Sequence, residues 1–209
     1  MTNSLADNNF KCKTMTLNGQ GNLTLIPDVA VIRLGVQTTG ESLLLIQNEN
    51  AQEVQSILQS LKRLGVTDVK TYQYSIDKLY DYENGNRIDK GYYVRNILEI
   101  KTRNMSQVGN IIDSAVNAGA NVVDLISFQV SEPEIYYQQA LNSAINNAIQ
   151  KSKSISMNLG MKTDPVPIQI IENSFSPLPK QQFQREVAAT PIIPGDIQID
   201  ASVTVVFLY

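Results

Sequence analysis

Histidine is absent from this 209-residue chain, and cysteine occurs only once, at Cys12. Histidine is the usual general base near neutral pH and the commonest nitrogen ligand for zinc or copper, so sites of these kinds lack their ordinary residue. A single cysteine cannot form an internal disulfide or a Cys-x-x-Cys pair. We therefore expect no metal centre and no cofactor. We interpret Cys12 as an incidental exposed thiol, and a redox or intermolecular-disulfide site is the alternative.

Clustered charge and long apolar runs are also missing. Charged residues make up 18% of the chain, the net charge is −3, and no run of cations exceeds Lys62 and Arg63. A phosphate-binding surface needs clustered cations, so we do not expect a nucleic-acid partner. No stretch approaches the ~20 apolar residues of a membrane span. Residues 1–13 lack the apolar core of a signal peptide and are expected to form a disordered tail. As written, the chain is expected in the cytoplasm; a location in the cell envelope or outside the cell is expected if a leader has been removed.

Residue periodicity predicts three main helices, at 42–64, 104–118 and 132–159. Apolar residues recur there three and four positions apart, and Gly65, Gly119 and Gly160 follow as stop signals. The string Ser131-Glu132-Pro133-Glu134 predicts a capping box at the start of the third helix. Strands are predicted at 15–26, 29–39, 69–80, 91–102, 122–130, 165–172 and 197–207.

The order of these elements predicts an α+β fold. Ala30, Ile32, Leu34 and Val36 share one apolar face of their strand, which we expect to meet the core. An Asn-Gly pair at 84–85 predicts a hairpin between the third and fourth strands. Strand, helix, glycine and strand occur in this order twice, as a weak internal repeat. We therefore expect a mixed β-sheet with hairpins and strand–helix–strand crossovers, and three helices packed mainly on one side.

Two short motifs are interpreted as structural rather than catalytic. Gly19 and Gly21 begin a dinucleotide-type glycine pattern, but the third glycine and the following helix are missing, so a bulge or a close approach to the strand is favoured. Ser75 and Lys78 match a Ser-x-x-Lys string, but in a strand they point to opposite faces.

Two apolar segments are candidate interfaces. Tyrosines at alternate positions would line one face of the third strand if that strand is unbroken. Such a face can serve a protein or glycan partner, or can pack across strands within the hairpin, and both interpretations stay open. The connection 173–196 is longer than an ordinary hairpin loop and carries apolar side chains. The candidate interface residues are Tyr72, Tyr74, Tyr80, Tyr82, Phe175, Leu178, Phe183, Ile192 and Ile193.

Three segments resemble the SIMPL domain family, also called DUF541. They are 17–39 (LNGQGNLTLIPDVAVIRLGVQTT), 91–130 (GYYVRNILEIKTRNMSQVGNIIDSAVNAGANVVDLISFQV) and 194–207 (PGDIQIDASVTVVF). The resemblance covers residues 14–209, implies one SIMPL-like domain there, and brings no catalytic motif. We therefore expect a non-enzymatic protein that acts through homo-oligomeric assembly and protein–protein contact. The resemblance also suggests a role in stress tolerance, through bacterial relatives. The alternative is a small-ligand binding protein, or an unrecognised enzyme with a carboxylate, lysine or tyrosine site.

Overall fold

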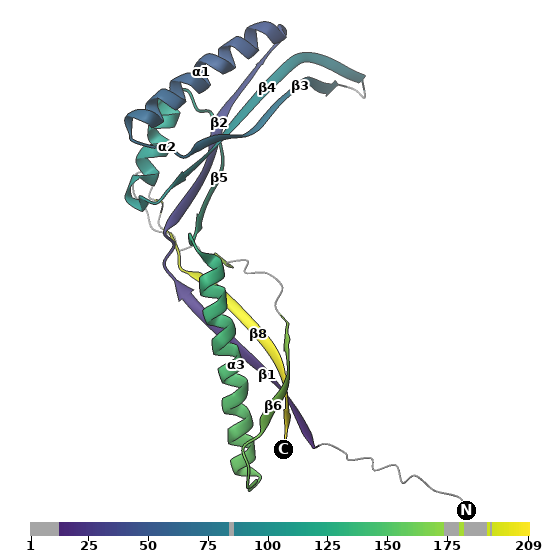
Figure 1. Cartoon of the computed structure of the whole chain (residues 1–209). Helices are drawn as coiled ribbons and strands as arrows, with labels where there is room; N and C mark the ends of the chain where they lie inside the picture. The colour runs from purple at the N-terminus through teal and green to yellow at the C-terminus, as the bar shows by residue number, and fades with distance from the viewer. Residues whose placement is uncertain (1–12, 84–85, 174–179, 182–191, 193) are drawn as a thin grey trace, which may run out of the picture. The chain divides into compact units, whose positions relative to one another are not determined.

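A computed structural model describes residues 13–83, 86–173, 180–181, 192 and 194–209 (Figure 1). The chain divides into two compact units. Unit 1 comprises Met1–Leu25, Glu132–Lys180 and Ile197–Tyr209, and unit 2 comprises Ile26–Ser131 and Gln181–Asp196. In sequence, unit 2 is therefore an insertion between the first strand and the longest helix of unit 1.

Unit 2 has a split β-α-β-β-α-β arrangement. Its elements are β2 (Val29–Gly40), α1 (Leu43–Arg63), β3 (Val69–Glu83), β4 (Asn86–Thr102), the one-turn helix η1 (Met105–Gln107), α2 (Val108–Asn117) and β5 (Val122–Gln129). The strand order in the sheet is β3-β4-β2-β5. This order and connectivity are those of ferredoxin-like folds. The weak repeat in the sequence corresponds to its two halves, β2-α1-β3 and β4-α2-β5.

The α+β class and the three main helices are confirmed, but the arrangement of the strands differs from the expected one. The strands form two sheets rather than one, and in both sheets every strand pairing whose register the structure gives is antiparallel. The strand–helix–strand crossovers exist, because β2 and β3 both run antiparallel to β4 and therefore run in the same direction. However, β4 lies between β2 and β3 in the sheet, so these two parallel strands are not neighbours.

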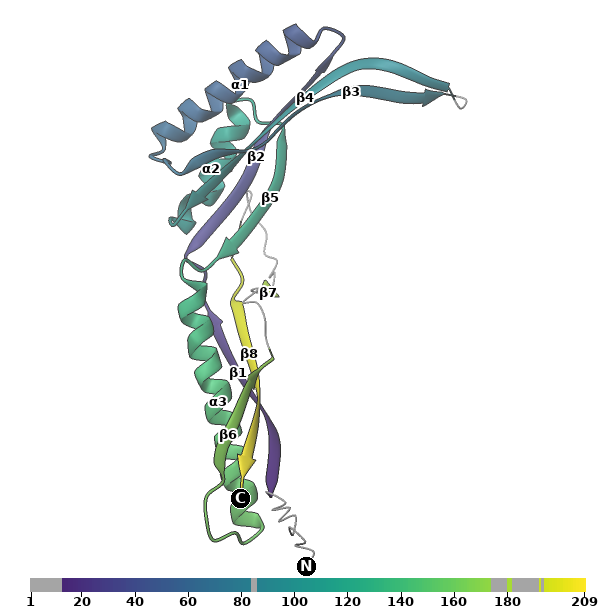
Figure 2. The same cartoon turned by 45° about the vertical axis from the view of Figure 1, so that its right-hand side comes forward.

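The core of unit 2 lies between the sheet and the helices α1 and α2, which cover the same face of the sheet (Figure 2). The predicted inward face of β2 is confirmed, since Ala30, Ile32, Leu34 and Val36 are fully buried. Both helices end in the same way. The N–H of Val66 donates to the Leu61 carbonyl at 3.1 Å and that of Ala120 to the Ala115 carbonyl at 2.9 Å. The residues before them, Gly65 and Gly119, have φ of 76° and 113°, which favours glycine.

Asn50, the polar break in the apolar stripe of α1, is buried in this core. Its Nδ2 donates to the backbone carbonyl of Val36 on β2 at 3.1 Å and to that of Val94 on β4 at 3.2 Å. These bonds satisfy the donor side of the amide, whereas its buried Oδ1 has no hydrogen-bond partner among the described residues. Asn50 therefore fixes the position of α1 over two neighbouring strands.

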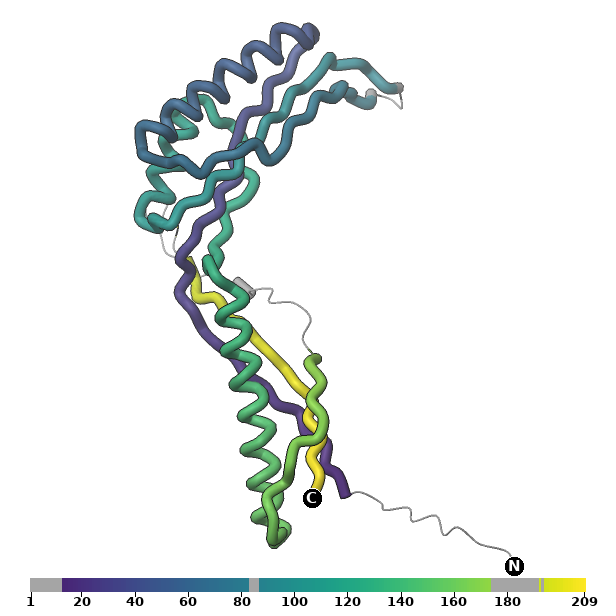
Figure 3. Tube along the Cα trace, in the orientation of Figure 1, coloured from purple at the N-terminus to yellow at the C-terminus, as the bar shows by residue number. Residues whose placement is uncertain are grey.

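Unit 1 packs one long helix on a second antiparallel sheet. Its elements are β1 (Thr14–Leu25), α3 (Pro133–Asn158), β6 (Val166–Glu172), β7 (Lys180–Gln181) and β8 (Ile197–Leu208). The sheet order is β1-β8-β6, and β7 also pairs with β8. In Figure 3 the green helix α3 runs beside the purple β1 and the yellow β8, the two strands that it contacts.

The helix α3 approaches β1 closely because both surfaces carry small residues. A Cβ added to Gly19 would lie 2.0 Å from the Ala144 carbonyl oxygen, and one added to Gly21 would lie 2.1 Å from the Ala140 carbonyl oxygen. The close approach predicted for these glycines is confirmed, and the partner is a helix rather than another strand. The residues of α3 that are buried in this contact are all small: Ala140, Ala144, Ala148, Ser152 and Ser156.

The predicted capping box at the start of α3 is not formed. The N-cap residue is Glu132, and it makes no side-chain capping bond. The hydroxyl of Ser131 instead donates to Asp28 Oδ2 at 2.6 Å, and its backbone N–H donates to Asp28 Oδ1 at 2.6 Å. Asp28 thus accepts the backbone N–H of Ser131 that Glu134 would accept in a capping box, and also takes the hydroxyl hydrogen bond.

Candidate functional site

The four candidate tyrosines do not line one face, because one extra residue in β3, at Tyr72, shifts the register of this strand against β4. The register with β4 shifts between Thr71 and Gln73 and again between Lys78 and Tyr80. Tyr72 lies at the first shift, where the guanidinium of Arg33 stacks over its ring at 3.6 Å. Arg33 lies on the face of the sheet opposite to the helices, whereas Tyr74 pairs with Asn96 on the helix-covered face.

The two remaining tyrosines lie on a projecting hairpin arm, which we define as residues 79–83 and 86–91. The last residue of β2, Gly40, pairs with Tyr92, so β3 and β4 continue beyond it as a two-stranded ribbon (Figure 1). Arg87 stacks over the Tyr80 ring at 4.2 Å, and Tyr82 is 70% exposed. A two-stranded hairpin is marginally stable in water without a third strand or packing partner.

An ion pair ties the two strands at the base of the arm. Lys78 Nζ lies 2.7 Å from Asp89 Oδ2. The hydrogen bond from Lys78 lowers the pKa of Asp89, and the same bond raises the pKa of Lys78. The arm therefore holds its register through its own cross-strand contacts, which leave Tyr82 free to contact another surface.

The candidate residues of the long connection fall largely outside the described part of the chain. Phe175, Leu178, Phe183 and Ile193 are among the residues that the structure does not describe. Ile192 is described, is half-buried, and packs against the core of unit 2. At this one residue, the connection therefore packs against its own chain.

Sequence reasoning missed an exposed apolar strand in unit 1. Every residue of β6 is exposed. Its aliphatic side chains remain accessible to large fractions: Val166 58%, Ile168 55%, Ile170 50% and Ile171 46%. The segment was predicted as a strand, but nothing in Val-Pro-Ile-Gln-Ile-Ile-Glu distinguishes an edge strand that lacks a cover from a strand buried on one face.

The two edge strands of this sheet, β1 and β6, differ in how their outer backbone groups are protected from pairing with another strand. On β1, Asn147 Oδ1 of α3 accepts the backbone N–H of Gln20 at 3.2 Å, and Lys151 Nζ of α3 donates to the carbonyl of Asn18 at 2.8 Å. The edge of β1 is thus capped by the helix. On β6, the register shifts between Pro167 and Gln169, and proline offers no N–H. Both features discourage further strand pairing there, although they leave the aliphatic side chains uncovered.

A buried carboxylate lies on the uncovered face of the unit 2 sheet. The side chain of Glu99 is only 7% exposed, and its oxygens lie 2.8 Å from Arg33 Nη2 and 3.1 Å from Lys70 Nζ. Burial raises the pKa of Glu99, but the hydrogen bonds from Arg33 and Lys70 outweigh it, and the pKa lies below its ordinary value. The cluster therefore holds a fixed, satisfied charge rather than a group ready to exchange protons.

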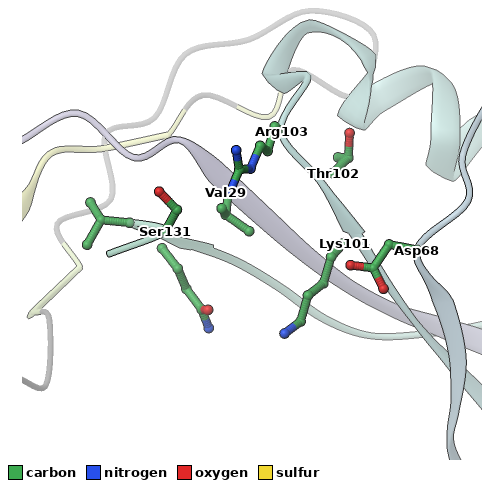
Figure 4. Close-up of a pocket in the computed structure, with 8 residues that line it drawn as sticks. Val29, Asp68, Lys101, Thr102, Arg103 and Ser131 are labelled. Carbon is green, nitrogen blue, oxygen red and sulfur yellow. The ribbon is translucent and has the colours of Figure 1, made fainter. Parts of the chain in front are cut away.

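A cavity of about 410 Å³ lies in unit 2 where β2 begins and β4 and β5 end. In Figure 4, Lys101 and Asp68 come from adjacent strand ends, and the guanidinium of Arg103 extends toward Val29. The backbone N–H of Lys101 donates to the Asp68 carbonyl at 3.0 Å, which fixes the two strand ends together. The lining residues are Val29, Asp68, Lys101, Thr102, Arg103, Gln129, Val130 and Ser131.

Among the residues that the structure describes, no group of three or more His, Cys, Asp or Glu side chains is placed to hold a metal ion. None of the helices in the described ranges is long and apolar enough to cross a membrane.

The comparison with protein families decides the relationship that the sequence suggested. The model described as "SIMPL: Protein of unknown function (DUF541)" matches residues 15–207. The chain belongs to the SIMPL family. Because the match begins inside β1 and ends inside β8, it includes residues of both units.

Curated relatives of this SIMPL chain come from bacteria. It is 24% identical over 199 residues to the "Uncharacterized protein YggE" of Escherichia coli (strain K12), covering 91% of this chain and 80% of that protein. It is 27% identical over 209 residues to the "26 kDa periplasmic immunogenic protein" of Brucella melitensis biotype 1, covering 92% of this chain and 83% of that protein.

Proposed function

We propose that this SIMPL protein acts without catalysis, by assembling with further copies of itself and contacting other proteins. The observation that carries the proposal is β6, a strand at the end of its sheet with four aliphatic side chains each about half exposed. Large apolar side chains that gather exposed on one edge strand favour an interaction site in a soluble protein.

The energetics require more than one contact surface. Fully burying an aliphatic side chain contributes about 1.5–3 kcal/mol, so completing the burial of the four half-exposed residues of β6 contributes about 3–6 kcal/mol. Association costs about 4–15 kcal/mol in lost translational and rotational freedom. We therefore infer that the β6 surface acts together with a second one, and the hairpin arm with Tyr80 and Tyr82 is the best candidate.

The chemistry of β6 favours contact through side chains rather than strand addition. Pro167 and the bulge that follows it interrupt the row of backbone donors at the edge. The aliphatic side chains project to both faces of the sheet, because successive residues of a strand alternate. A neighbouring copy would thus pack against the faces of β6, and its own arm would gain the packing partner that a lone hairpin lacks.

The relative named as a periplasmic immunogenic protein supports a location in the cell envelope for this chain. A role in stress tolerance and the absence of enzymatic activity stay predictions, the first from the family resemblance and the second from the lack of a catalytic motif.

Light scattering on two matched variants tests the proposal. The double variant Ile168→Lys/Ile170→Lys places charge on the β6 surface and is expected to lower the mass in solution. The control, Leu44→Lys/Leu45→Lys, charges two leucines of α1 that are each 68% exposed and is expected to keep the mass of the unaltered chain. A wild-type monomer at tens of micromolar contradicts the proposal. Replacing residues 176–190 by a short Gly/Ser link measures separately what the long connection contributes.

A further inference from the structure

The cavity at the strand ends of unit 2 contains two cations that form no ion pair with any residue that the structure describes. Neither Lys101 nor Arg103 lies within 4.0 Å of a carboxylate oxygen in the described part of the chain, whereas other cations of the same unit pair with Glu99, Asp89 or Asp124. We propose that this cavity binds a small anion that carries carboxylate or phosphate groups, with Lys101 and Arg103 as its charged ligands. The inference does not depend on the proposed assembly.

Two carboxylates near these cations form no ion pair with them. Asp28 interacts with Arg103 through space, but its oxygens accept hydrogen bonds from Ser131, each at 2.6 Å. Its pKa is lowered chiefly by the hydrogen bond from the Ser131 side chain, and Arg103 makes the smallest contribution. Asp68 is the one acid that lines the cavity, against two cations, so the lining keeps a net positive charge.

The side chains of the two cations select the kind of anion. Lys101 is the last residue but one of β4, and Arg103 directly follows the strand. Arginine offers a planar fork that binds a carboxylate or phosphate through two hydrogen bonds, and lysine adds a point charge. Together they match two anionic groups on one small molecule. A cavity of about 410 Å³ has the size of a site for such a metabolite rather than for a polymer.

Titration calorimetry with citrate and with inorganic phosphate tests the site, at constant ionic strength set with sodium chloride. We expect citrate to bind the unaltered protein, and the variant Lys101→Gln/Arg103→Gln to weaken binding at least tenfold. The control variant Lys62→Gln/Arg63→Gln removes the same two charges from the last turn of α1 and is expected to bind citrate as the unaltered protein does. Binding of phosphate as tight as that of citrate would assign the site to a single anionic group, which still supports it.

A second readout keeps the test independent of the double variant's stability. Citrate is expected to shift the amide NMR signals of residues 101–103 and 129–131 in the unaltered protein. The single variant Arg103→Lys keeps the charge but loses the fork, so it is expected to bind more weakly than the unaltered protein and more tightly than the double variant. The proposal is wrong if neither anion binds at millimolar concentration, if the control weakens binding equally, or if the shifted signals lie elsewhere.

Discussion

Replacing Glu99 by glutamine removes the one charge that holds the buried cluster of unit 2 together. The glutamine has nearly the same shape, so packing around the site is retained. Arg33 and Lys70 then keep their charges without a carboxylate, and Arg33 must rely on its stacking with Tyr72. We expect the variant to be less stable than the unaltered protein because a partly buried guanidinium has lost its counter-charge.

The size of the loss follows from the exposure of the three side chains. Removing one partner of a fully buried ion pair costs about 3–5 kcal/mol. Here the side chain of Glu99 is 7% exposed, but those of Arg33 and Lys70 are 27% and 62% exposed, so water replaces part of the lost interaction. Discounting for this exposure, we expect a loss of about 2–3 kcal/mol in the free energy of unfolding.

The loss should also depend on pH. The pKa of Glu99 is lowered in the folded protein from its ordinary value of 4.5. Its stabilising contribution is therefore complete above that unfolded-state pKa and is lost as pH falls through the folded pKa. The difference between the unaltered protein and the glutamine variant should be constant near neutral pH and should shrink as acid is added below about pH 4.5.

Urea unfolding followed by circular dichroism measures the loss, and hydrogen exchange locates it. Exchange should speed up in β2 and β4, whereas β1 and β8 of unit 1 serve as internal reference. Asp89→Asn is the matched control, because it breaks an ion pair of similar length between exposed side chains and is expected to change stability little. A Glu99→Gln variant no less stable than this control would refute the reasoning from burial.

Two further predictions follow from local geometry. Gly19→Ala should destabilise unit 1 by about 3 kcal/mol or more, because its Cβ would lie 2.0 Å from the Ala144 carbonyl oxygen and α3 must move. The control Gly65→Ala meets no atom within 4 Å but has a φ of 76°, so it should cost only about 1–2 kcal/mol. Equal losses of the two variants in urea unfolding would contradict the packing argument. Asp28→Asn should reduce the fall in the free energy of unfolding at acid pH. The pKa of Asp28 is lowered from 3.8 in the folded protein, so its stabilising contribution is present above that pH and disappears as pH falls through the folded pKa. An unchanged acid-induced loss in unfolding titrations would contradict this.

Local patterns were enough to predict the elements of this fold. The inward face of β2 follows from strict alternation, and the ends of the helices follow from Gly65 and Gly119, whose positive φ few other residues tolerate. The close approach at Gly19 and Gly21 was also visible, since two glycines in a strand leave room for another backbone.

Features that depend on distant residues were not predictable. Ser131 forms no capping box because it donates hydrogen bonds to Asp28, which lies 103 residues earlier in the chain. The bulge at Tyr72 reverses the faces of the later tyrosines, and periodicity contains no signal for one extra residue. The exposure of β6 depends on where α3 lies, because the helix covers β1 and β8 and leaves β6 uncovered.

The measurement that bears most directly on the proposed assembly is the mass of the unaltered chain by sedimentation equilibrium at tens of micromolar. The single chain has a mass of 23.2 kDa. The account predicts a defined multiple of this mass that returns toward the single chain when β6 carries lysines. A mass of one chain across the whole concentration range would contradict the account.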